Sequence, residues 1–303
     1  EIVASDWSSD VCSSDLRIIM AVFQNQATLS YKNNVTSSNI VTGELVEVLS
    51  ATKTPVGSTY TVGGEVTYVV SIINSGTTPI SGVTVTDNLG EYSFGAGTVV
   101  PLTYLENTLL HYQNGVLQAT PVIEQGDDLK VSGIVIPAGG ESILVYKTRV
   151  NEFANPNEGG QITNQVVVSG DGISTTVLAD ATITPENEAV LSIQKGISPS
   201  EVAENGRLTY TFIITNTGIA AATEEDQIVI SDLFQPVLSN IQVLYNGAVM
   251  TVTADYTYDE TTGQFDTVAG VITVPAATYT QDETTGAWNI TPGVTTVVVT
   301  GTV

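Results

Sequence analysis

The sequence predicts an all-β protein, with two tandem β-sandwich domains preceded by an N-terminal strand arm. Thr, Val, Ile and Gly are abundant and the aromatic residues are mainly Tyr, which is typical of strands. Clusters of Gly, Asn and Pro separate short apolar runs at the spacing expected of a sandwich. A length of 303 residues is enough for two domains that each bury a core.

An internal repeat defines the two domains. The segments LSATKTPVGSTYTVGGEVTYVVSIINSG (49–76) and LSIQKGISPSEVAENGRLTYTFIITNTG (191–218) align without a gap at an offset of 142 residues. Further along, VTVTD (83–87) corresponds to IVISD (228–232). Such self-similarity indicates two copies of one unit. We place the domains at residues 49–184 and 185–303.

Segments of the repeat have the period of a half-buried strand. In LTYTFIIT (208–215), one face carries Leu208, Tyr210, Phe212 and Ile214, and the other face carries mainly Thr. This alternation predicts a strand with one face in a core.

Residues 1–19 differ in composition from everything that follows and include Trp7 and Cys12. Back-translated, DWSSDVCSSDL (Asp6–Leu16) resembles a common short-read sequencing-library adapter. The resemblance implies that residues 1–16 are an assembly artefact and that Met20 is the true start; the alternative is a genuine N-terminal tail. The segment MAVFQNQ has neither a basic nor an apolar signal region, so we expect no signal peptide after Met20.

Residues 20–48 look like a displaced copy of part of the repeat. Domain one continues through ITNQVVVSGDGISTTVLADATIT (162–184), which predicts a final hairpin that the second repeat does not reach before Val303. The segment FQNQATLSYKNNVTSSNIVTGEL (23–45) aligns with that hairpin, Asn25 on Asn164 and, after a one-residue gap, Val35 on Ile173. We interpret residues 20–48 as an arm that supplies this hairpin to domain two.

A sandwich without its last two strands has open sheet edges and an unfilled apolar groove. Phe23, Ala27 and Leu29 alternate correctly to fill such a groove. The arm can close domain two of its own chain or of a neighbour. We favour the neighbour, because self-closure must span the whole of domain one. A third interpretation is that the gene is truncated and its own final hairpin was lost.

The segment GGEVTYVVSIINSGTTPISGVTVTD resembles the repeat domain of bacterial surface proteins known as domain of unknown function eleven. The resemblance covers both repeats, but the second departs from it at the acidic insertion GIAAATEEDQ. It implies an immunoglobulin-like sandwich and a structural role at the cell surface, and it supplies no catalytic residues.

Strand parity turns several polar residues toward the predicted cores. Each domain would direct one Lys and one Asp inward. One Asn would join them, supplied by the final hairpin in domain one and by the arm in domain two. The residues are Lys53, Asp87 and Asn164 for domain one, and Lys195, Asp232 and Asn25 for domain two.

Buried charges are costly unless they are paired, and burial favours a neutral lysine amine. The combination resembles the self-forming Lys–Asn isopeptide bonds of Gram-positive pilins and adhesins. By that resemblance, Asp87 would assist a Lys53–Asn164 bond within domain one, and Asp232 would assist a Lys195–Asn25 bond between subunits. The simpler alternative is that Lys and Asp lie at strand ends while Asn binds the backbone.

Composition argues against several function classes. A formal net charge of −24 opposes binding to nucleic acid or anionic membranes, and no apolar run is long enough to span a membrane. His111 is the only histidine, and no phosphate loop or metal-ligand spacing is present, so we expect neither an enzyme nor a cofactor.

We therefore predict the subunit of a bacterial surface or extracellular filament, pilus-like or spore-appendage-like, whose partner is another copy of itself. The alternative is a monomeric adhesin or carbohydrate-binding module that recognises a host or glycan ligand. We expect the protein at the cell or spore surface.

Overall fold

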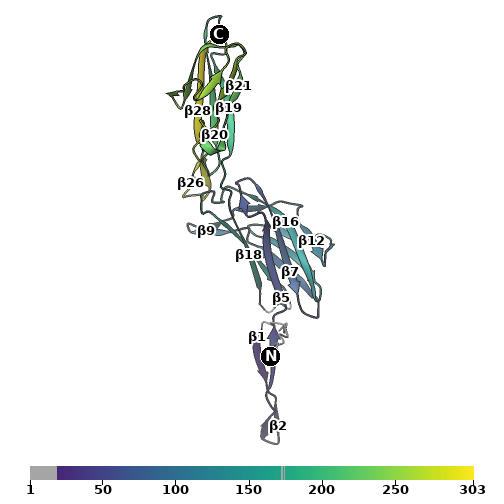
Figure 1. The fold of residues 1–303 in the computed structure, drawn as a ribbon. Helices are drawn as coiled ribbons and strands as arrows, with labels where there is room; N and C mark the ends of the chain where they lie inside the picture. Colours follow the sequence, from purple (N-terminus) through teal and green to yellow (C-terminus); the bar gives the residue numbers. More distant parts are fainter. Residues whose placement is uncertain (1–18, 172, 174) are drawn as a thin grey trace, which may run out of the picture.

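The computed structural model describes residues 19–171, 173 and 175–303, and nearly all its regular structure is β (Figure 1). The one helical element among these residues is a 3₁₀ turn, η1 (Glu224–Asp226). The predicted all-β class is therefore confirmed. The adapter-like stretch Asp6–Leu16 lies outside the described residues.

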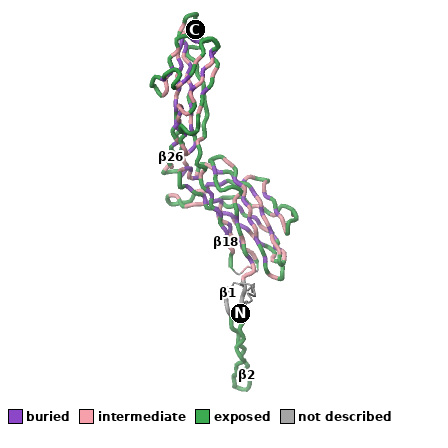
Figure 2. The backbone as a smooth tube through the Cα atoms, in the orientation of Figure 1, coloured by how far each residue is buried: buried purple, intermediate pink, exposed green. Residues whose placement is uncertain are grey.

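The N-terminal arm is a long β-hairpin that projects from domain one. Strand β1 (Ile19–Asn25) pairs with β4 (Val41–Val46), and β2 (Thr28–Tyr31) pairs with β3 (Asn34–Ser37). The connecting residues Lys32 and Asn33 have φ angles of 44° and 68°, as a tight two-residue hairpin turn requires. From residue 23 to residue 42 every side chain of the arm is exposed (Figure 2).

Domain one consists of two packed antiparallel sheets. The first sheet contains, in spatial order, β13 (Val116–Leu117), β12 (Leu110–Gln113), β16 (Gly140–Val150), β7 (Glu65–Asn74) and β5 (Leu49–Val56), with β11 (Leu102–Tyr104) also paired to β16. The second contains β14 (Val122–Gln125), β15 (Leu129–Ile136), β8 (Ile80–Asp87), β17 (Ile162–Ser169), β18 (Val177–Pro185) and β6 (Thr59–Tyr60), the last pair parallel. A small ribbon is formed by β9 (Tyr92–Phe94) and β10 (Gly97–Val99).

The last hairpin, β17–β18, closes the core of domain one. Strand β17 pairs with β8 in the second sheet, and β18 packs against β5 of the first sheet. The inward residues Ile162, Val166 and Ile183 are fully buried or nearly so. Alternation of apolar and polar residues along both strands explains this placement, because successive strand side chains point to opposite faces.

Domain two repeats the first sheet of domain one but has a smaller second sheet. Its first sheet contains β19 (Leu191–Ser198), β20 (Arg207–Asn216), β28 (Gly293–Thr302), β22 (Ser239–Tyr245) and β23 (Ala248–Val249). The opposing sheet contains β21 (Ser231–Leu233), β25 (Gln264–Thr267) and β24 (Tyr256–Tyr258). The core is a separate cluster that includes Phe234 and Phe265.

The domains meet through the hairpin of β26 (Thr278–Gln281) and β27 (Trp288–Thr291). The Trp288 backbone N–H donates to the Glu152 carbonyl of domain one at 2.7 Å. The arm, domain one and domain two follow one another along the long axis of the molecule, with the C-terminus at the end far from the arm (Figure 1).

A buried lysine cluster and an open groove

Domain one buries a lysine–aspartate pair in its core. Lys53 on β5 places its Nζ 2.8 Å from Oδ2 of Asp87 on β8, and the two side chains are 0% and 2% exposed. The same Oδ2 accepts the Tyr146 hydroxyl, and Oδ1 accepts the Leu89 backbone N–H at 2.9 Å. Asp87 is therefore held by three donors, as a buried carboxylate requires.

Burial dominates the protonation of this cluster. Loss of hydration lowers the pKa of Lys53 to about 8, although the neighbouring Asp87 carboxylate acts in the opposite direction. Burial also raises the pKa of Tyr146 well above its ordinary value. A lysine with a pKa near 8 has a larger neutral, nucleophilic fraction at neutral pH than an exposed lysine.

Asn164 lies in the same core without a hydrogen-bond partner. Its side chain is 0% exposed, and neither its amide nitrogen nor its amide oxygen is satisfied. Its strand places it two residues from Val166, which is directly opposite Asp87. The Tyr68 hydroxyl is near enough for the Asn164 amide to oppose the rise in the pKa of Tyr68 that burial causes. The ammonium of Lys53 lies 4.8 Å from the centre of the Tyr68 ring, so Lys53, Asp87 and Asn164 share one environment.

The corresponding pair in domain two is not enclosed. Lys195 on β19 and Asp232 on β21 form an ion pair, but their side chains are 40% and 18% exposed. The predicted burial of Lys195 is therefore not found in the single chain. The reason is that no described segment covers β19 as β18 covers β5 in domain one.

An uncovered apolar face lies along β19 beside this pair, and we call it the groove because β18 covers the corresponding face of β5 in domain one. Leu191, Ile193 and Ile197 are 39%, 55% and 51% exposed, whereas Leu49, which aligns with Leu191, is 7% exposed. Strand β21 pairs with β25 alone, whereas its counterpart β8 pairs with both β15 and β17. Among the described residues, the position of the β17–β18 hairpin is therefore vacant in domain two.

The arm carries exposed side chains suited to this position. Phe23, Leu29 and Val35 are 57%, 61% and 70% exposed, and Asn25 and Ala27 are also exposed. The arm extends from the end of domain one opposite domain two (Figure 1). Asn25 is therefore not brought to Lys195 or Asp232 within one chain.

The arm and β17–β18 are both antiparallel hairpins, but their registers differ by one residue. Asn25 is paired with Val41, 16 residues further along the chain, whereas Asn164 is paired with Ala181, 17 residues further along. The same difference separates the pair of Phe23 and Gly43 from the pair of Ile162 and Ile183.

Val35 does not occupy the position of Ile173. Val35 lies in β3 and pairs with Ser30 of β2, whereas Ile173 lies in the loop between β17 and β18. The tight turn at Lys32 and Asn33 replaces that loop, and this explains the difference.

Two features were not identified from the sequence. Tyr146 and Tyr68 lie in the cluster around Lys53, and the alternation of Leu144, Tyr146 and Thr148 is the signal that turns Tyr146 inward. The second feature is a cavity at the joint between the domains, which lies between segments far apart in the sequence.

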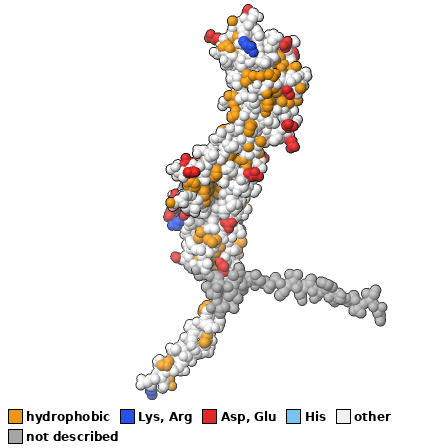
Figure 3. All heavy atoms as spheres, turned by 90° about the vertical axis from the view of Figure 1, so that its left-hand side faces the viewer, with side chains coloured by type: hydrophobic (Ala, Val, Ile, Leu, Met, Phe, Trp, Pro, Cys, Tyr) orange, Lys and Arg blue, Asp and Glu red, His pale blue; other side chains and the backbone are white. Residues whose placement is uncertain are grey.

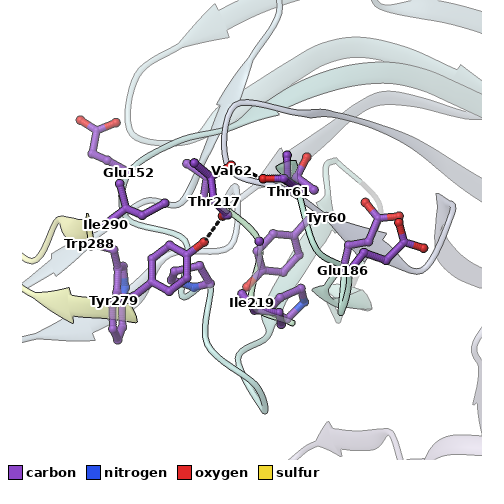
Figure 4. A pocket seen from close by; sticks show the side chains of 15 residues that line it. Tyr60, Thr61, Val62, Glu152, Glu186, Thr217, Ile219, Tyr279, Trp288 and Ile290 are labelled. Atoms are coloured by element: carbon purple, nitrogen blue, oxygen red, sulfur yellow. Dashed lines mark hydrogen bonds between the residues drawn. The ribbon is translucent and has the colours of Figure 1, made fainter. Parts of the chain in front are cut away.

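The cavity has a volume of about 430 Å³ and is lined mainly by apolar side chains (Figure 4). The rings of Tyr60, Tyr279 and Trp288 line it, and Glu152 and Glu186 are also among its lining residues. The buried Trp288 Nε1–H has no acceptor. Aromatic rings with a few polar groups are typical of small-ligand sites.

The remaining candidate groups have structural explanations. His111 Nε2 lies 2.7 Å from the Ser142 hydroxyl in a buried pair. The described residues contain no cluster of three or more His, Cys, Asp or Glu side chains that could hold a metal ion. A helix of membrane-spanning length and hydropathy is likewise absent from the described part of the chain.

No protein-family model and no curated protein sequence matches the chain. It is similar to the major pilin subunit BcpA of Bacillus cereus, at 11% identity and a TM-score of 0.34, over 89% of this chain and 73% of that one. The full-length major pilin SpaD of Corynebacterium diphtheriae is 11% identical, with a TM-score of 0.33, over 81% of this chain and 59% of that one.

A third similar structure is that of AvmM, which catalyses macrocyclisation in alchivemycin A biosynthesis. It is 10% identical with a TM-score of 0.31, over 54% of this chain and 98% of that one. Likeness at these levels does not distinguish between a filament subunit and an enzyme.

Proposed function

We propose that this protein is the structural subunit of a bacterial surface or extracellular filament. Subunits assemble head to tail by donor-strand complementation, with the arm of one subunit completing domain two of the next. The observation that carries the proposal is the vacant hairpin position in domain two, together with an arm that is itself an antiparallel hairpin with exposed apolar side chains. Backbone pairing supplies affinity in this mode, and alternate side chains set the register.

The placement of the two surfaces supports a filament over a closed dimer. The arm lies at one end of the molecule and domain two at the other (Figure 1). A contact between two different surfaces that does not close on itself generates an open chain of subunits. Phe23, Ala27 and Leu29 would then occupy the groove along β19, as Ile162, Val166 and Val168 fill domain one.

We also propose that the lysine clusters form isopeptide bonds, as the resemblance to pilin and adhesin cross-links suggests. The neutral Lys53 amine attacks Cγ of Asn164, the C–N bond to the amide nitrogen breaks, and ammonia leaves. Asp87 carries the proton from the amine to the leaving nitrogen. In domain two the equivalent reaction joins Lys195 to Asn25 of the entering arm, assisted by Asp232, and it links neighbouring subunits.

Electron microscopy of purified protein tests the assembly. Residues 20–303 should form filaments, and a chain lacking residues 20–45 should remain monomeric while keeping the circular dichroism spectrum of folded domains. A full chain that stays monomeric at every concentration and retains its arm would contradict the proposal.

Intact-mass measurement tests the covalent step separately. The full chain should be lighter than its sequence by one ammonia for the bond in domain one, and Asn164→Ala should have the mass of its own sequence. An unmodified mass for the unaltered chain would end the isopeptide proposal and leave non-covalent assembly intact.

The cavity at the domain joint favours a second candidate function, a surface adhesin that binds carbohydrate. Aromatic rings and carboxylate residues in one lining are suited to a sugar ring and its hydroxyls. Binding to a glycan array that is lost in Trp288→Ala, by a protein that forms no polymer, would favour this function over the filament.

A further inference from the structure

The register of the last hairpin in domain one fixes where the tip of a docked arm would lie. Strand β17 runs antiparallel to β8, with Val166 opposite Asp87 and Ser169 opposite Thr84. The chain beyond stays close to β8, since a Cβ added at Gly170 would meet the Gly82 carbonyl oxygen at 2.8 Å. The hairpin tip therefore lies beside the start of β8.

The same register can be transferred to domain two. Asp87 aligns with Asp232, so Gly82 corresponds to Gln227. On the other side, Asn25 of the arm aligns with Asn164, so Lys32 corresponds to Asp171. In domain one, the residue after Gly170 is the one opposite Gly82 in the β17–β8 register. In a docked arm that position is taken by Lys32, which would therefore lie opposite Gln227. The three residues before Gln227 form the acidic turn η1, Glu224–Asp226.

Both the turn before Gln227 and the tip of the arm differ in charge from the corresponding positions of domain one. Domain one has no acidic residue in TTPISG (77–82), and its hairpin loop carries Asp171 where the arm carries Lys32. Lys32 is the only Lys or Arg between residues 19 and 48. Lys32 lies in the turn that joins β2 to β3, and Figure 3 shows a basic side chain at the far tip of the arm.

The acidic turn has room for a cation. Its three residues are exposed, and Glu224 and Glu225 form no ion pair within the described part of the chain. Asp226 is already engaged, because the Thr223 backbone N–H donates to its Oδ2 at 2.6 Å. Glu224 and Glu225 are therefore the free carboxylates of the turn.

We infer that Lys32 of an entering arm pairs with the Glu224–Glu225 carboxylates of the next subunit, and that this contact sets the direction and register of docking. The inference rests on the proposed donor-strand assembly. An arm that entered reversed, or shifted along the groove, would leave Lys32 away from the turn and Asn25 away from Lys195. Exposed ion pairs add little affinity, but they favour one orientation and speed association at low salt.

Assembly kinetics of the full chain, followed by light scattering at low and high salt, test this inference. Lys32→Glu should slow filament growth by about tenfold at low salt, and the difference should shrink at high salt as charges are screened. The double variant Lys32→Glu with Glu225→Lys should regain most of the rate.

Lys130→Glu is the matched control. It makes the same change of charge at an exposed lysine of domain one, outside the arm and the groove, and should leave the rate close to that of the unaltered chain.

Two outcomes separate this inference from the proposed function. If Lys32→Glu assembles like the Lys130→Glu control while arm deletion abolishes filaments, the ionic contact is wrong and donor-strand assembly stands. If deletion of the arm leaves filaments unchanged, the proposed function fails, and the contact inferred from it fails too.

Discussion

The two domains contain the same inward lysine and aspartate but place them in different environments. In domain one, Lys53 and Asp87 are enclosed by the β17–β18 hairpin, and their side chains are 0% and 2% exposed. In domain two, the aligned Lys195 and Asp232 also form an ion pair, yet the lysine lies at the open groove. The aligned strands β5 and β19 are similar in sequence, so they do not explain the difference. It comes instead from the β17–β18 hairpin, which covers the lysine of domain one.

Aligned residues therefore lie in a closed core in one domain and on an open face in the other. Leu49 contributes to the stability of domain one, whereas Leu191 presents apolar surface to solvent. Exposed apolar surface beside an unpaired strand edge is a site for another strand.

The largest contrast is expected from removing the two aspartates. In an uncrosslinked Asn164→Ala background, Asp87→Ala leaves a buried lysine without its counter-ion and should cost about 3 to 5 kcal/mol of unfolding free energy. Asp232→Ala removes a partly exposed pair and should cost below about 1 kcal/mol. Urea unfolding of the arm-deleted chain measures both, and equal losses would show that the two pairs do not differ in environment.

Truncating a residue of the closed core and one of the open face should give the next largest difference. Ile183→Ala creates a cavity in the closed core of domain one and should cost about 2 to 5 kcal/mol. Ile193 is 55% exposed, so Ile193→Ala should change the stability of the monomer by less than about 0.5 kcal/mol. The same Ile193→Ala should weaken filament assembly. A large loss of monomer stability in Ile193→Ala would mean that the groove is already filled.

Supplying the missing hairpin should stabilise one domain only. A synthetic peptide of residues 20–46, added to the arm-deleted chain at about one hundred times its dissociation constant, should stabilise domain two by about 2.7 kcal/mol. Domain one should not change, since its groove is occupied by β17–β18. Differential scanning calorimetry distinguishes the two transitions, and an Asn25→Ala peptide shows how much of the effect depends on the amide.

The smallest effect is a pH dependence confined to domain one. The pKa of Lys53 is lowered by burial from 10.5 in the unfolded chain to about 8 when folded. Between these values the unfolded state binds more protons, so the stability of an uncrosslinked Asn164→Ala variant should rise with pH, by about 2 kcal/mol from pH 8 to 10.

Above about pH 10 the trend should reverse. Burial raises the pKa of Tyr68 and Tyr146, so the unfolded chain loses their protons first. Chemical denaturation at several pH values measures the curve. Adding Lys53→Met to the same background should remove the rising part, and a rise that persists would assign it to another group.

Much of this arrangement could be predicted from the sequence, and the failures have physical causes. Strand parity correctly turns Lys53, Asp87 and Asn164 inward, because the period of a strand is two wherever it lies. Parity also predicts an inward Lys195, and it fails there because burial depends on what covers the face. Pairing of Val35 with Ser30 was missed because the tight Lys32–Asn33 turn shortens the loop that the alignment assumed.

Residue order is enough to predict the strand pattern and the repeat, because periodicity and self-similarity are properties of the sequence, and the relation of the arm to β17–β18 stays a prediction. The three-dimensional structure was needed to show that the arm lies away from its own domain two, that β19 is open and that tyrosines surround Lys53. These facts depend on contacts between segments far apart in the chain, and strand alternation does not specify which segments meet.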